Sequence, residues 1–138
     1  MSFFKPGLDY RESFVASVTL FEMEWQQNKE AYASLIEEGF ISDTDKNRFD
    51  ILTKRFNYSE RRSYPCVEVG AVSWDKKATT GKKTKEKLLL SISSLYCKHP
   101  TLALKGFAIT YSHRGSELPK NFDEEAKKFI AGVVVPES

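Results

Sequence analysis

Six lysines within a twelve-residue segment form the densest cluster of functional side chains in the chain. They are Lys76, Lys77, Lys82, Lys83, Lys85 and Lys87, and Glu86 is the only acid among them. Flexible ammonium groups on a loop can neutralise phosphates without strict geometry. The aromatic ring of Trp74, which precedes the cluster, is suited to stacking on a nucleic-acid base. The segment therefore indicates an anionic partner. The alternative is a solvated hairpin loop whose lysines keep a sheet edge from aggregating.

Part of this segment is similar to a phosphate-binding loop but lacks one essential residue. The pair Gly81-Lys82 is followed by Lys83 and Thr84. The full motif also needs a glycine five residues before the Gly-Lys pair, and that position is Lys76. Without this glycine the backbone amides cannot form the usual nest around a phosphate. The sequence therefore does not predict a nucleotide-triphosphate site.

Two cysteines and two histidines have the chemistry of a zinc site, but their spacing does not fit one. Cys66, Cys97, His99 and His113 include no Cys-x2-Cys or His-x3-His pair. Ser112 and His113 are adjacent, so on a strand they point to opposite faces and cannot act as a nucleophile and its base. We therefore predict no catalytic residue, no metal site and no cofactor.

Composition indicates one globular domain. The 138 residues are 41% hydrophobic and include ten Phe, six Tyr and two Trp, which is enough for a core. Two cysteines do not make a disulfide framework. The N-terminus does not read as a signal peptide, and the apolar stretch 14–25 contains two glutamates and is too short to span a membrane. We expect a cytoplasmic protein with both thiols free.

The first 60 residues favour two helices. Asp9 and Glu12 have capping-box spacing, the aromatic stripe that follows has helical periodicity, and Gly39 is suited to end the helix. The competing interpretation is a strand over 13–25, since Phe, Val and Thr favour sheets. Ser42 is a fair N-cap for a second helix, whose apolar face would be formed by three residues: Phe49, Leu52 and Phe56.

The rest of the chain favours strands. Residues 66–74 and 102–111 are rich in β-formers, and the apolar phase of the second run changes at Lys105-Gly106, as a β-bulge would cause. Residues 88–97 suit either a helix or a strand, and we favour the strand. Asn121 and Glu124 then suggest a helix over 120–132.

We therefore predict an α+β fold, with an N-terminal helical hairpin (8–60) packed on an antiparallel β-meander (64–115) and a short C-terminal helix (120–132). A curved sheet wrapped around a long helix is the alternative, and it would create a pocket.

Three functions remain open. The first is a non-catalytic protein that binds another macromolecule through charged surfaces that include the lysine segment 76–87. The second is a nucleic-acid-binding protein that uses the same segment. The third is a small-ligand or enzymatic role in a pocket between the helices and the sheet. The residues proposed to line that pocket are Trp25, Tyr96, Tyr111 and His113. The sequence gives no oligomeric state.

Overall fold

The computed structural model describes residues 2–4, 13–24, 28–79 and 85–134. Its elements, in chain order, are β1 (Ser2–Phe4), β2 (Ser13–Glu22), α1 (Lys29–Asp43), β3 (Phe49–Ser59), β4 (Cys66–Thr79), β5 (Lys85–Lys98), β6 (Lys105–Gly115) and α2 (Phe122–Gly132). The strands form an antiparallel sheet in the order β1-β2-β6-β5-β4-β3. The fold is therefore α+β, as predicted.

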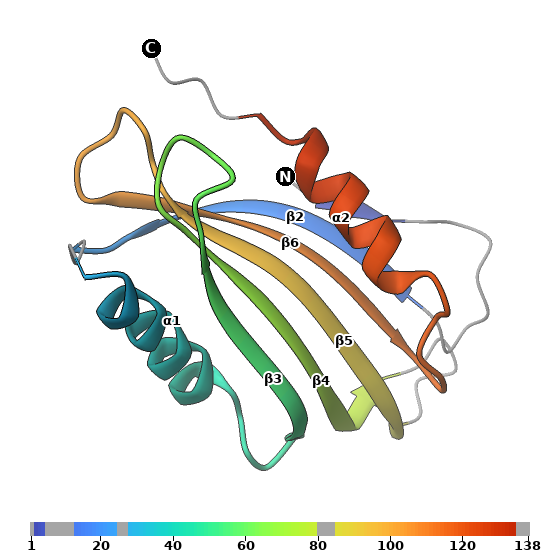
Figure 1. Cartoon of the computed structure of the whole chain (residues 1–138). Helices are drawn as coiled ribbons and strands as arrows, with labels where there is room; N and C mark the ends of the chain where they lie inside the picture. The colour runs from blue at the N-terminus through green and yellow to red at the C-terminus, as the bar shows by residue number, and fades with distance from the viewer. Residues whose placement is uncertain (1, 5–12, 25–27, 80–84, 135–138) are drawn as a thin grey trace.

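The two helices cover opposite faces of this sheet (Figure 1). The strands arch, with α1 on the inner side of the arch and α2 on the outer side. Tyr32 and Ile36 of α1 pack on Val67 and Val69 of β4. The buried Tyr32 hydroxyl donates a hydrogen bond of 3.0 Å to the Tyr96 carbonyl oxygen of β5. Because side chains alternate along a strand, the neighbours of these β4 residues face α2.

The core under α2 is built around a disulfide. Cys66 of β4 and Cys97 of β5 are direct cross-strand partners and are bonded to each other. They form a buried cluster with Leu95, Phe107 and Ile109, onto which α2 packs through its apolar side. The expectation of two free thiols is thus wrong, because the pairing of β4 with β5 brings the two cysteines face to face. A cytoplasmic location therefore does not follow from the two cysteines.

The predicted N-terminal helical hairpin is also wrong. Residues 13–22 form β2, so the competing strand interpretation is the correct one for this segment. Among the described residues, one helix precedes the four-stranded meander. It begins at Lys29 after the N-cap Asn28, whose side chain accepts from two backbone amides. Gly39 lies inside α1 and does not terminate it. Asp9 and Glu12 are outside the described residues.

The second predicted helix is the strand β3. Its register with β4 shifts between Ile51 and Thr53, so Leu52 lies at a bulge and half of its surface is exposed. An extra residue in a strand changes which face the later side chains occupy. The spacing of Phe49, Leu52 and Phe56 therefore imitates one face of a helix, although these residues belong to a bulged strand.

Residues 88–97 lie within β5, as favoured. The bulge predicted at Lys105-Gly106 is absent from the described register of β6 with both of its neighbours. The strand instead begins at Lys105, and Leu104 before it has a positive φ of 58° in a turn. The apolar phase changes there because Leu102 and Leu104 precede the strand. Both are exposed.

The C-terminal helix is present as α2, but its predicted cap differs. The Asn121 side chain makes no capping hydrogen bond; its Nδ2 donates to Glu125 Oε1 at 3.0 Å. Arg62 anchors the other end of α2, because its Nη2 donates to the carbonyl oxygens of Ile130 and Val133, each at 2.8 Å.

Among the described residues, neither helix is long and apolar enough to cross a membrane.

Candidate functional site

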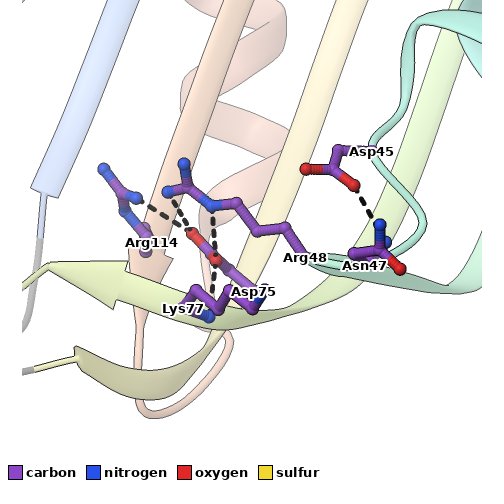
Figure 2. A network of polar contacts seen from close by, with 6 residues as sticks. All are labelled: Asp45, Asn47, Arg48, Asp75, Lys77 and Arg114. Atoms are coloured by element: carbon purple, nitrogen blue, oxygen red, sulfur yellow. Dashed lines mark hydrogen bonds and ion pairs between the residues drawn. The ribbon is translucent and has the colours of Figure 1, made fainter.

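The most connected polar group of the described structure is the carboxylate of Asp75, near the end of β4 (Figure 2). Its side chain is completely buried. Arg48 forms a bidentate pair with it, Nε to Oδ1 at 2.8 Å and Nη2 to Oδ2 at 2.9 Å. Arg114 Nη1 donates to Oδ2 at 3.0 Å, and the Lys77 backbone amide donates to Oδ1 at 3.1 Å. Two guanidinium groups thus share one carboxylate, and the cluster has one surplus positive charge.

Hydrogen bonding keeps this carboxylate ionised. Burial by itself raises the pKa of Asp75. The bonds from Arg48, the Lys77 amide and Arg114 outweigh burial, so the pKa of Asp75 is lowered overall. In return, the hydrogen bond to Asp75 raises the pKa of Arg48. The cluster is therefore a permanent set of charges at neutral pH.

Three segments that are distant in sequence position the cluster. Arg48 ends a turn in which the Asp45 carbonyl oxygen accepts the Arg48 amide at 3.0 Å and Asp45 Oδ1 accepts the Asn47 amide at 2.9 Å. Pairing of β4 with β5 and of β5 with β6 then aligns Asp75 and Arg114 on the same face of the sheet. The Arg48 carbonyl oxygen accepts the Lys76 amide at 2.8 Å, which ties the turn to β4.

Both arginines retain donors that can reach solvent. About a third of each side chain is exposed, 37% for Arg48 and 32% for Arg114. Arg48 Nη1 and Arg114 Nη2 make no hydrogen bond to the described part of the protein. Two outward N–H groups beside a surplus charge can bind an anionic oxygen.

The described lysines of the predicted segment lie at this same end of the sheet, where β4 pairs with β5. Lys77 and Lys87 are exposed. Lys76 pairs with Asp50 at 3.3 Å, and Lys87 Nζ lies 4.5 Å from the centroid of the Trp74 ring. Stacking of a base on that side of Trp74 would require Lys87 to move.

The remaining lysines of the segment are only partly described. Lys82 and Lys83 lie outside the described residues, and of Lys85 only the backbone position in β5 is described. We define the basic end of the sheet as Arg48, Lys76, Lys77, Lys87 and Arg114.

The structure separates the four residues predicted to line a pocket. Tyr96 faces α1 and lines a pocket there. Tyr111 and His113 are on the opposite face, near α2. Tyr111 donates to Glu125 Oε2 at 2.9 Å, and burial followed by this carboxylate raises the pKa of Tyr111 to about 12. His113 is completely buried, 4.5 Å from the Phe14 ring centroid. Trp25 is outside the described residues.

Sequence reasoning missed the Arg48–Asp75 pair because no local pattern links its two members. Asp75 stands beside the lysines and reads as a compensating surface charge. Arg48 falls within the predicted second helix. The sequence does contain one signal: Asp75 lies at steps of two from Val67, Val69 and Ala71, so on a continuous strand it shares their apolar face.

The comparison with other proteins adds no identity to this chain. The sequence matches no protein-family model, and no curated protein matches it in sequence.

Proposed function

We propose that this is a non-catalytic protein that binds an anionic macromolecule, nucleic acid in the first instance, through the basic end of the sheet. The observation that carries the proposal is the convergence of the Arg48–Asp75–Arg114 cluster and the β4–β5 hairpin at one end of the sheet. Lysines on a hairpin adapt to a phosphate backbone, and the two arginines add donors in fixed positions.

The role of Asp75 supports a binding site with preset geometry. Two arginines placed side by side would repel each other and spread apart in water. The shared carboxylate holds them together while leaving one positive charge in excess. An incoming phosphate then meets donors that have already lost their side-chain freedom, which lowers the entropic cost of binding.

Charge is unevenly divided along the sequence. The first 60 residues contain 7 basic and 11 acidic side chains, and the other 78 contain 14 and 8. The basic end takes Arg48 from the first part and its other four members from the second, and a local surplus of positive charge can orient an anionic partner during encounter.

The test is fluorescence anisotropy with labelled single- and double-stranded DNA and RNA, at low and at physiological salt. We expect binding that weakens steeply as the salt concentration rises. The slope of log K against log salt concentration should become shallower by about one for each phosphate-contacting lysine that is replaced. The test variant replaces Lys76, Lys77, Lys82 and Lys83 by alanine. The control replaces an equal number of exposed lysines elsewhere: Lys29, Lys98, Lys127 and Lys128.

Loss of binding in the first variant and retention in the control would support the proposal. Binding that is insensitive to salt, or equal weakening in both variants, would refute the hairpin as the site. No binding at low salt would remove nucleic acid as the partner.

A further inference from the structure

A pocket of about 470 Å³ lies between α1 and the face formed by β2, β6 and β5. Its wall is mainly apolar, and its described lining contains three aromatic rings, a few threonine hydroxyls and one carboxylate, but no lysine or arginine. The rings and the acid are Phe21, Phe40, Tyr96 and Asp43. No residue of the basic end lines this pocket, so it is a separate site from that surface.

The three rings that line the pocket come from three elements. Phe21 of β2 and Tyr96 of β5 have centroids 6.0 Å apart with an interplanar angle of 57°. Phe40 of α1 packs edge-on against Phe56 of β3, with ring centroids 5.6 Å apart. The faces of such rings attract organic cations. A pocket with several rings therefore favours a cationic ligand with an apolar body.

The carboxylate adds negative charge at one end of this pocket. Asp43 is the last residue of α1, where the helix dipole already has its negative end, and the last turn contains no basic residue. Asp43 is exposed and forms no ion pair with another described residue. Burial raises the pKa of Tyr96, and the negative charge of Asp43 raises it further. The charge of Asp43 therefore acts on a group that lines the pocket. An acid at this position is unfavourable for the isolated helix and becomes favourable when a cation binds.

A glycine leaves room for such a ligand. Gly39 lies within α1, where glycine is a poor helix former, and it lines the pocket. No heavy atom lies within 4 Å of the position that a Cβ would occupy, so packing does not require a glycine here. The missing side chain does enlarge the space beside Asp43.

From these observations we infer that the pocket under α1 binds a small organic cation, with an ammonium group near Asp43 and an apolar body among Phe21, Phe40 and Tyr96. This inference is independent of the proposed function, since its site and the charge of its ligand are different.

The test compares two probes of equal shape, 2-phenylethylamine and the neutral 2-phenylethanol, by NMR titration of the isotope-labelled full chain. We expect saturable shifts at Thr19, Gly39 and Thr110, and binding of the amine that is about five- to tenfold tighter than that of the alcohol. Asp43→Asn should remove this preference. The control Asp123→Asn, an exposed acid of α2, should keep it.

A second pair of variants tests the space itself. Gly39→Leu should abolish binding of both probes, because its side chain occupies the pocket while improving helix propensity. Gly39→Ala should preserve binding. Absence of saturable shifts with millimolar amine, equal affinity for the two probes, or an amine preference that survives Asp43→Asn would overturn the inference.

Discussion

Replacing Asp75 by asparagine keeps the shape of the side chain and removes the charge that joins Arg48 to Arg114. Three hydrogen bonds from guanidinium groups, at 2.8, 2.9 and 3.0 Å, lose the carboxylate charge, and one carboxylate oxygen is replaced by an NH2 group that faces other donors. Hydrogen bonds to charged groups contribute roughly 1.5–3 kcal/mol each. Because both arginines are about one-third exposed, water recovers part of this loss.

We therefore expect Asp75→Asn to lower the free energy of unfolding by about 3 kcal/mol, at the lower end of the range for breaking a buried ion pair. For a chain of this length, that is a fall in Tm of about 10 °C. Urea denaturation followed by circular dichroism measures the change. Arg48→Gln and Arg114→Gln, combined with Asp75→Asn, complete double-mutant cycles that isolate each pair.

The pH dependence gives a second readout. The pKa of Asp75 is lowered in the folded state, so its contribution is complete above the unfolded-state pKa of about 3.9 and is lost as the pH falls through the folded value. The stability gap between the parent protein and Asp75→Asn should be constant from about pH 7 to pH 5 and narrow below about pH 4. A gap under about 0.5 kcal/mol at neutral pH, or one that widens in acid, would refute this account of the cluster.

Three further perturbations test other contacts. Replacing Cys66 and Cys97 together by alanine should lower the free energy of unfolding by about 3–4 kcal/mol, because the bond closes a loop with a sequence separation of 31. Urea denaturation of the parent protein in reductant should show a smaller loss than the alanine variant, because the buried sulfur atoms stay in the core. Tyr32→Phe should cost about 1–2 kcal/mol in the same assay, because it leaves the Tyr96 carbonyl oxygen without its donor. Arg62→Ala should speed hydrogen exchange in the last turn of α2, while the first helix is unaffected.

The fold class and the second half of the chain could be predicted from the sequence because local signals there agree with the tertiary structure. Residues 67–75 alternate between buried and half-buried positions, and Asn121 marks the start of a helix. The strand over 88–97 was ambiguous by periodicity alone, and its pairing with two neighbours decides it.

The first half could not be predicted because local and tertiary signals conflict there. In β2, Leu20 and Phe21 are adjacent apolar residues on opposite faces, and Leu20 is 63% exposed, so strict alternation is lost. In β3 the bulge next to Leu52 imitates a helical period. The Arg48–Asp75–Arg114 cluster depends on strand pairing, which the sequence does not state. The lysine segment was visible because it is local.

The position of β2 in the sheet has a consequence for how the chain folds. Strands β3 to β6 pair with their successive neighbours, so they can form as a series of hairpins during synthesis. β2 lies beside β6. The paired residues of these two strands that are closest in sequence, Glu22 and Lys105, are 83 positions apart. Closing so long a loop is entropically costly and slow. We therefore expect β2 to wait for β6 to leave the ribosome. A circular permutant that opens between α1 and β3 and joins the natural chain ends brings β2 closer to β6 in sequence, with only α2 and β1 between them, and it should fold faster than the natural order.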